Sequence, residues 1–291
     1  MATQTVTPDH YIDAFKQFEQ SLNGKSNTPV HSLRKEAISQ FAELGFPTTR
    51  DEDWSHTSVA PITRVPYRFV GGAPSGRPSA DPTAGFAFAK QWTDAVRLVF
   101  VNGHLSPEHS QTAGLPDGVR IESLASVLES GDDLVHDQLG RHAPYREHPF
   151  AALNTAFISD GALIHVPDGV ALETPVHVVY YSTLASDEPS VSHPRTLVLI
   201  GANSQATVVE SYTGEGAYFT NSVTEVVAGA GGVVDHYKLG LESDEAHHVA
   251  TMQTRQGRDS KVSTHSISLG GRLVRNDINA LLAGEGSDAI I

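Results

Sequence analysis

The sequence predicts a mainly β protein whose C-terminal part is a solenoid of stacked coils, preceded by an α-helical region. The strongest observation is a repeat that starts with a glycine at positions 201, 229, 257 and 284, at intervals of 28, 28 and 27 residues. Polar, glycine-rich turns alternate there with short runs of β-branched residues. A period of this length is typical of repeat proteins whose coils bury their apolar faces against one another.

The residues five positions after each leading glycine are the second observation. They are apolar in every repeat: Ala206, Val234, Val262 and Ala289. Most of the residues that follow them are polar: Thr207, Asp235, Ser263 and Ile290. This alternation predicts a half-buried strand in each coil. A second strand is expected before each later glycine. A meandering antiparallel sandwich, with turns that recur by accident, is the alternative fold.

Two helices are expected in the N-terminal region. Thr7 and Pro8 suit the cap and first position of a helix with an aromatic stripe, which ends at Asn23-Gly24. The second is expected from about Ser32 to Gly45, with one apolar face. The residues at helical spacing are Tyr11, Phe15, Phe18 and Leu22 in the first helix, and Leu33, Ala37, Phe41 and Leu44 in the second. We interpret both stripes as packing surfaces.

The elements that follow are shorter and mixed. Residues 45–62 are interpreted as a solvated loop with Trp54 packed into the body, and the Gly-, Pro- and Ser-rich residues 71–85 as an exposed linker. A strand from Val96 is expected to turn at Asn102-Gly103. The remaining predictions are a weak helical pattern over 121–140, a short helix over 150–157, and strands over 162–166, 176–181 and 196–200.

These elements divide the chain into four parts. They are an N-terminal helical region (1–70), a linker (71–94), a mixed connecting region (95–160) and a β-helix core (161–291).

Composition narrows the function classes. The formal net charge of −14 repels phosphate backbones, so nucleic acid is not expected as a partner. The chain contains no cysteine, which rules out disulfides and thiolate chemistry within it. The N-terminus does not resemble a signal peptide, and no apolar run is long enough to span a membrane. We therefore expect a cytoplasmic protein with no membrane partner.

The fifteen histidines raise the question of a metal site. His236 and His265 lie seven and eight residues after their leading glycines, so strand alternation places them on opposite faces. The pair His247-His248 adds no recognised ligand spacing. Because a zinc site needs three or four convergent ligands, no metal ligand is predicted in this chain.

A hydrolytic site is the other chemical candidate. Polysaccharide-cleaving enzymes use paired carboxylates, and Asp235, Arg275 and Asp277 form the set that could serve. We prefer to interpret these residues as a salt-bridged or solvated turn. The glycine-rich stretch 228–232 lacks a following helix that could hold a phosphate, and is interpreted as a solenoid corner. No catalytic or cofactor-binding residue is therefore predicted.

Several short motifs, in order along the chain, resemble the SufB/SufD family of iron–sulfur cluster assembly proteins, and SufD more than SufB. They are Gly45-Phe-Pro47 with Arg50, Glu52, Trp54 and Thr57; Val99-Phe-Val-Asn-Gly103 with Ser106 and Ser110; Phe150-Ala-Ala-Leu-Asn-Thr-Ala156; Asp160-Gly161; Ile164-His-Val-Pro167; Pro175-Val-His-Val178; and Arg275, Asp277, Leu282 and Gly284. Ser55 and His56 depart from the basic and aromatic residues usual before Thr57.

The resemblance implies a right-handed parallel β-helix core with helical flanks. It also implies a non-catalytic component of a complex with a SufB-like scaffold protein and a SufC-like ATPase. An iron–sulfur cluster or a reduced flavin in the assembled complex is implied by the family alone, with no cofactor in this chain. Since the family continues beyond the position of Ile291, we expect a truncated chain and a possible homodimer through the exposed edge of the β-helix.

Two other functions stay open from the sequence. A β-helix enzyme that cleaves polysaccharides would need a groove lined by Asp235, Arg275 and Asp277. A structural or adhesive solenoid would be expected to have more coils and a secreted chain.

Overall fold

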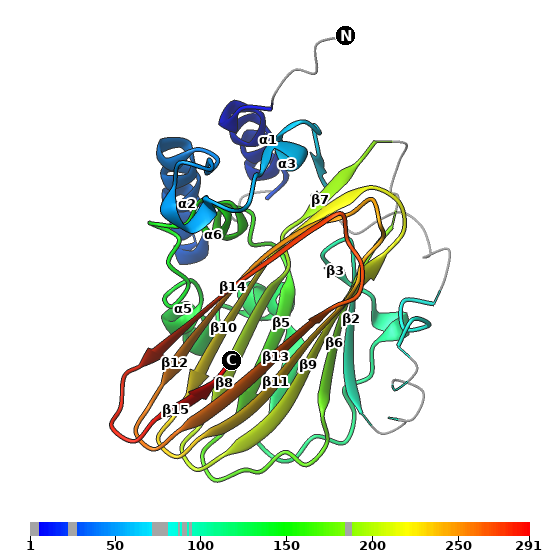
Figure 1. The fold of residues 1–291 in the computed structure, drawn as a ribbon. Helices are drawn as coiled ribbons and strands as arrows, with labels where there is room; N and C mark the ends of the chain where they lie inside the picture. Colours follow the sequence, from blue (N-terminus) through cyan, green and yellow to red (C-terminus); the bar gives the residue numbers. More distant parts are fainter. Residues whose placement is uncertain are drawn as a thin grey trace.

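The fold is described from a computed structural model, for residues 6–22, 28–71, 81–86, 88, 92, 95–183 and 188–291. Two sheets of mostly parallel strands face each other, and a layer of helices lies beside one of them (Figure 1). Most of the linker expected over 71–94 lies outside the described residues, as does the helix stop expected at Asn23-Gly24. The prediction of a mainly β solenoid with N-terminal helices is confirmed.

The N-terminal helices agree with the sequence pattern, with one shifted start. They are α1 (Pro8–Ser21), α2 (Pro29–Leu44), the 3-10 helix η2 (Glu52–Trp54) and α3 (Ala60–Thr63). The second helix starts before Ser32 because the Thr28 hydroxyl accepts the His31 N–H at 3.3 Å and Pro29 occupies the first turn. Leu44, expected on the apolar face, is 40% exposed.

The connecting segment contributes strands as well as helices. Its elements are β1 (Arg68–Phe69), β2 (Val96–Val101), β3 (His104–Leu105), the 3-10 helix η4 (Pro107–His109), β4 (Arg120–Ser123), α4 (Leu124–Ser130), α5 (Asp133–Gln138) and α6 (Pro149–Ala156). The turn at Asn102-Gly103 is confirmed, with φ angles of 50° and 84°. The strand before it, β2, pairs in parallel with β6 (Val176–Ser182) and so belongs to the solenoid.

The helical pattern over 121–140 is wrong in part. Ile121 lies in β4, and the rest forms two helices instead of one. The Ser123 side chain caps α4, and Gly131, with φ 71°, ends it. Asp132 then caps α5 by accepting the Leu134 N–H at 2.9 Å. The two N-caps, nine residues apart, therefore override the weak apolar periodicity.

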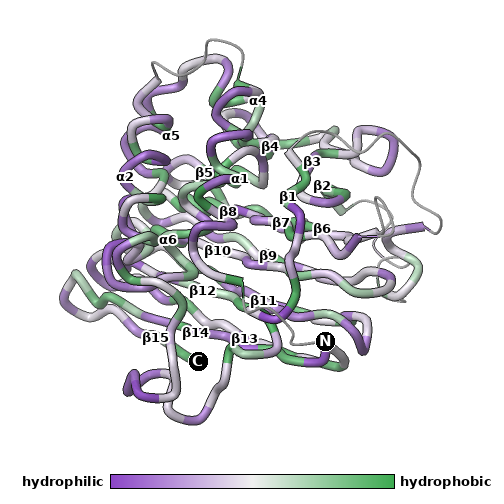
Figure 2. Tube along the Cα trace, turned by 90° about the horizontal axis from the view of Figure 1, so that it is seen from above, coloured by the Kyte–Doolittle hydropathy of each residue, from purple (hydrophilic) through white to green (hydrophobic). Residues whose placement is uncertain are grey.

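The solenoid strands are β5 (Gly161–Val166), β6 (Val176–Ser182), β7 (Ser190–Ser192), β8 (Arg195–Ile200), β9 (Gln205–Gly214), β10 (Tyr218–Ala228), β11 (Val233–Leu241), β12 (His247–Gln256), β13 (Lys261–Ser268), β14 (Leu273–Leu282) and β15 (Asp288–Ile290). In the described part of the chain they form two sheets. Sheet A runs β5, β8, β10, β12, β14 and sheet B runs β6, β9, β11, β13, β15, and each strand pairs in parallel with the next. Figure 2 shows both stacks from above.

The predicted interior column is confirmed. Val234 pairs with Ala206 on one side and Val262 on the other, and Val262 pairs with Ala289. Ala206, Val234 and Val262 are buried among the apolar side chains between the two sheets. The 28-residue interval thus equals one coil of the solenoid, and equivalent residues lie directly above one another.

The recurring turns have a backbone cause. Four turn residues take positive φ angles: Asn203 (54°), Gly231 (68°), Asp259 (55°) and Gly286 (74°). Each of the first three donates its N–H to a carbonyl of the next coil, with Asn203 bonded to Ala230 and Gly231 bonded to Arg258 at 2.8 Å. The left-handed conformation favours Gly, Asn and Asp. This requirement explains the polar, glycine-rich start of each repeat.

The helical layer packs on the outer face of sheet A (Figures 1 and 2). One apolar cluster joins Phe15 and Phe18 of α1, Phe157 after α6, and Phe219 and Val249 of the sheet. Trp54 is buried in the same cluster and packs against Phe150, as the sequence indicates. The helices are therefore anchored to the solenoid, whose interior lies on the other side of sheet A.

Candidate functional site

A group of polar and charged side chains lies between the two sheets, where an apolar core would be expected. We call it the interior polar cluster. It consists of Tyr180, Thr196, Glu210, Tyr212, Tyr218, Thr224, His236, Lys238, Glu242, His248 and Asn276. All but Asn276 are buried. Burying several ionisable groups is costly unless they are paired, so their partners decide what the cluster can do.

Strand alternation brings these groups inside. In β9 and β11 the inward positions begin with the apolar column of Ala206 and Val234 and continue, two residues at a time, to Glu210 and Lys238. Lys238 pairs in register with Glu210 on one side and Ser266 on the other. The sheet geometry therefore stacks a carboxylate, an ammonium and a hydroxyl in successive coils.

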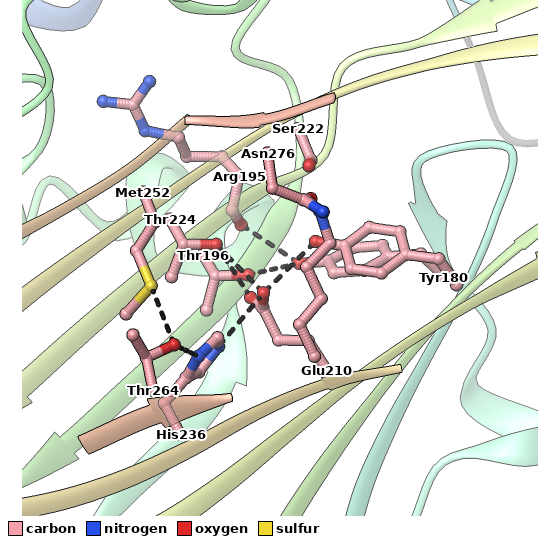
Figure 3. Close-up of polar contacts among 12 residues, drawn as sticks. Tyr180, Arg195, Thr196, Glu210, Ser222, Thr224, His236, Met252, Thr264 and Asn276 are labelled. Carbon is pink, nitrogen blue, oxygen red and sulfur yellow. Dashed lines mark hydrogen bonds and ion pairs between the residues drawn. The ribbon is translucent and has the colours of Figure 1, made fainter. Parts of the chain in front are cut away.

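Glu210 is the centre of one half of the cluster (Figure 3). Its carboxylate accepts the Thr224 hydroxyl at 3.0 and 3.1 Å and the Tyr212 hydroxyl at 3.2 Å, and it lies 3.4 Å from His236 Nε2. His236 Nδ1 in turn lies 2.9 Å from the Thr264 hydroxyl. This carboxylate is thus surrounded by groups that stabilise its charged form.

Replacing Glu210 by glutamine is expected to lower the free energy of unfolding at neutral pH. Burial alone would raise the pKa of Glu210, but the hydrogen bond and charge of His236, together with Lys238, lower it from 4.5 to about 2. The unfolded chain binds this proton near pH 4.5, whereas the folded chain binds it near pH 2. The stabilisation is therefore present above pH 4.5 and is lost as the pH falls towards 2; by linkage it is about 3 kcal/mol.

Urea denaturation of wild type and Glu210→Gln at several pH values measures this effect. The difference between the two proteins should be largest above pH 5 and should shrink as the pH falls. Glu245→Gln is the matched control, since that side chain is exposed. A difference that does not change with pH would contradict the assignment.

The second half of the cluster is a chain of contacts that begins at Lys238. The Lys238 ammonium lies 2.7 Å from His248 Nε2 and donates to Asn276 Oδ1 at 2.6 Å. His248 Nδ1 lies 2.5 Å from Glu242 Oε1, and Glu242 also accepts the hydroxyl hydrogen bond of Tyr218. A carboxylate, an imidazole and an amine are therefore in direct series.

The histidines named from the sequence do not form a metal site. His236 is buried in the interior, whereas His265 is exposed and stacks on Tyr237 with ring centroids 5.3 Å apart. The predicted opposite placement is confirmed. His247 faces away from its neighbour His248, with its Nδ1 2.5 Å from the Tyr67 hydroxyl. Within the described ranges, no three His, Asp or Glu side chains are placed to hold a metal ion.

Asp235, Arg275 and Asp277 do not converge either. Asp235 lies on the outer side of sheet B and accepts the Ser263 hydroxyl at 2.6 Å. Arg275 and Asp277 form an ion pair at 2.7 Å on the outer side of sheet A. The guanidinium of Arg275 lies 3.9 Å from the centre of the Trp54 ring and donates to Thr57 at 3.3 Å. These residues join two distant motifs of the chain instead of lining one groove.

The interior polar cluster was missed by the sequence reasoning, although part of its signal is present. Glu210, Lys238 and Ser266 each lie nine residues after a leading glycine, at Gly201, Gly229 and Gly257. The apolar column lies five residues after each leading glycine, so it is separated from these residues by four positions. Because side chains alternate along a strand, positions four apart lie on the same, inward face. Extending the column by four residues would have revealed the buried charges.

Comparisons with known proteins agree with one another. Residues 6–178 match the family model described as SufBD protein N-terminal region, and residues 182–291 match that described as SUF system FeS cluster assembly, SufBD core domain. Similar proteins include an iron–sulfur cluster assembly SufBD family protein of Synechocystis sp. (27% identical; 93% of this chain and 60% of the relative). They also include the iron–sulfur cluster assembly proteins SufD of Escherichia coli (24%; 86% and 55%) and SufD of Bacillus subtilis (26%; 85% and 57%).

The chain thus spans between 55% and 60% of the length of these relatives. None of the helices in the described segments has the length and apolar character needed to cross a bilayer.

Proposed function

The chain belongs to the SufBD family of SUF-system iron–sulfur cluster assembly proteins, and on this premise we propose that it is a SufD-like, non-catalytic component of the assembly complex. In this role it acts through protein–protein contacts in the cytoplasm. Its partners are a SufB-like scaffold protein and a SufC-like ATPase. The observation that carries the proposal is the pair of family matches, which together cover residues 6–178 and 182–291.

The contact between Arg275 and Trp54 supports the same proposal. Both residues belong to motifs that resemble the SufB/SufD family, and they lie 221 positions apart in the sequence. In the fold they stack, with Thr57 and Asp277 bonded to the same guanidinium. A cation on the face of a tryptophan contributes about 0.5–2 kcal/mol. Together the two motifs therefore fix the N-terminal region on the solenoid.

The assembled cluster would be cargo of the complex and not a resident group of this chain. Iron–sulfur clusters are held mainly by cysteine thiolates, and this sequence contains no cysteine. The residues here do not fit a cluster ligand set on their own. Whether a reduced flavin joins the complex, and whether the protein forms a homodimer through its solenoid edge, stay predictions.

The polysaccharide-cleaving alternative is not favoured by the site geometry. Its proposed residues are divided between the outer sides of two different sheets, with Asp235 on one and Arg275 and Asp277 on the other. A pair of carboxylates must lie on either side of one glycosidic bond, roughly 5–10 Å apart. A groove that holds all three residues would have to pass around the solenoid.

Co-purification tests the proposed function. We expect the tagged protein, at its full natural length, to retain a SufB-like and a SufC-like protein from the same organism when all three are co-expressed. An unrelated P-loop ATPase and an unrelated β-solenoid protein serve as controls for non-specific retention. Failure to retain either partner would contradict the proposal, as would equal retention of the controls.

A further inference from the structure

Lys238 is an unusual residue for the inside of a solenoid. Its amine is buried, and each of its close contacts comes from a different strand: His248 on β12, Asn276 on β14 and the Tyr212 ring on β9, whose centroid is 4.9 Å away. In two of these contacts the chemistry of the partner makes Lys238 the hydrogen-bond donor. Asn276 Oδ1 can only accept a hydrogen bond, while His248 Nε2 accepts one when the imidazole is neutral.

The other side of His248 fixes which nitrogen carries the hydrogen. Glu242 already accepts the Tyr218 hydroxyl, and its Oε1 lies 2.5 Å from His248 Nδ1. Because an ionised carboxylate only accepts, the imidazole hydrogen lies on Nδ1 and the lone pair of Nε2 faces Lys238. In this arrangement the carboxylate orients the imidazole, and the imidazole can accept a proton from the amine that it contacts.

We propose that Lys238, His248 and Glu242 form an internal proton relay in which Lys238 and His248 share one proton. In one form Lys238 is an ammonium ion and His248 is neutral. In the other, the Lys238 proton has moved to His248 Nε2, which leaves a neutral amine beside an imidazolium–carboxylate pair. The total charge is the same in both forms, so the transfer needs no outside reactant. Lys238 is then an internal base of the solenoid.

Burial and the surrounding charges act on both members of the pair. The titratable groups that face Lys238 are Glu210 and Tyr212 on β9, His236 on its own strand, His248 on β12, and Glu242 with its partner Tyr218. Asp277 on β14 pairs with Arg275 on the outer side of sheet A. Burial lowers the pKa of Lys238 to about 8, although Glu210 and Glu242 act in the opposite direction. Burial, followed by the charge of Lys238, also lowers the pKa of His248, and Glu242 acts against both.

A small cavity lies beside Lys238. A cavity of about 10 Å³ is lined by Lys238, Ser266, Asn276 and Asp277. This volume is on the order of that needed for a single water molecule. The lining combines the polar groups of Lys238, Ser266 and Asn276 with the apolar side chains of Ala250, Met252 and Ile278.

A side-chain titration of the whole protein, with lysine labelled with ¹³C and ¹⁵N, tests whether Lys238 acts as an internal base. The Lys238 resonance is identified by its absence in Lys238→Arg or, should that variant not fold, by its magnetisation transfer to the Tyr212 ring. We expect it to titrate near pH 8, more than two pH units below the usual value for lysine. Titration together with the surface lysines would overturn the proposal.

A matched pair of variants tests whether Glu242 is coupled to Lys238, as the relay requires. Glu242→Gln keeps a hydrogen-bond acceptor for His248 but removes the charge, and it should lower the Lys238 midpoint by about one further pH unit. Glu245→Gln removes an exposed carboxylate from the same loop and should leave the midpoint unchanged. Equal midpoints in the two variants would contradict the relay. Partner binding does not enter these measurements, so they are independent of the proposed role in the complex.

Discussion

Replacing Arg195 by methionine is expected to lower the free energy of unfolding by about 3–5 kcal/mol, because it leaves the buried carboxylate of Glu225 without its counter-charge. Both side chains are fully buried, with Nη2 2.5 Å and Nε 3.1 Å from Glu225 Oε2. Methionine keeps much of the volume of the arginine stem. The lost stability therefore comes more from electrostatics than from packing.

The same pair also joins the helical layer to sheet A. Glu225 accepts the backbone N–H groups of Gly140, His142 and Ala143 at 2.8–3.0 Å. Arg195 donates through Nη1 to Asn154 Oδ1 at 3.0 Å and Thr155 Oγ1 at 3.2 Å, both on α6. Loss of the guanidinium should therefore weaken the docking of α6 as well as the ion pair.

Urea denaturation measures the effect, with Arg146→Met as the matched control. Arg146 pairs with Glu36 at 2.6 Å, but these side chains are 66% and 46% exposed. An exposed pair of this kind contributes less than about 1 kcal/mol. If the two variants were destabilised equally, burial could not be the source of the effect. Hydrogen exchange should then also show no selective opening of α6 in Arg195→Met.

The sequence contained enough to predict the solenoid but not this ion pair. The interior column is visible because one coil takes 28 residues, so equivalent positions recur at a fixed interval. Arg195 and Glu225 are separated by 30 residues and are not equivalent positions, since Arg195 pairs in register with Val223. Their partners at Gly140 and Asn154 lie in a segment with no repeat at all. Contacts between a repetitive and a non-repetitive part depend on docking, which periodicity does not encode.

The interior polar cluster also contains both residues that the sequence pattern could place and residues that it could not. Glu210 and Lys238 could be placed inside by counting along the column from Ala206 and Val234. Glu242 could not, because it follows the end of β11 at a corner, where strand alternation no longer fixes the direction of a side chain. The link from Glu242 through His248 to Lys238 required the structure. The residues on regular strands were predictable in principle, whereas Glu242, which orients His248, was not.

Gly161→Ala is expected to be about as damaging as loss of the buried arginine, at about 3–5 kcal/mol, for reasons of space and backbone conformation. Gly161 has a φ angle of 152°, and a β-carbon there would lie 1.8 Å from the Arg195 carbonyl oxygen. That oxygen belongs to the neighbouring strand β8, which pairs with β5 along its whole length. Relief of the contact would therefore require the two strands to separate.

The preceding residue holds the backbone in this position. The Asp160 carboxylate accepts hydrogen bonds from the N–H groups of Leu105, Ala125 and Gly161 and from the Ser123 hydroxyl, at 2.6–3.1 Å. Three of these bonds tie the start of β5 to β3, β4 and α4. The turn cannot move aside to make room for a methyl group without breaking several of them.

Gly169→Ala separates the two parts of the expected effect. Gly169 also has a positive φ angle, 75°, but no atom lies within 4 Å of the position its β-carbon would take. It should therefore show the conformational cost alone, about 1–2 kcal/mol. Urea denaturation of both variants gives the comparison. If Gly161→Ala cost no more than Gly169→Ala, the close approach of β5 to the Arg195 carbonyl would not be a constraint on the fold, and the Asp160-Gly161 motif would need another explanation.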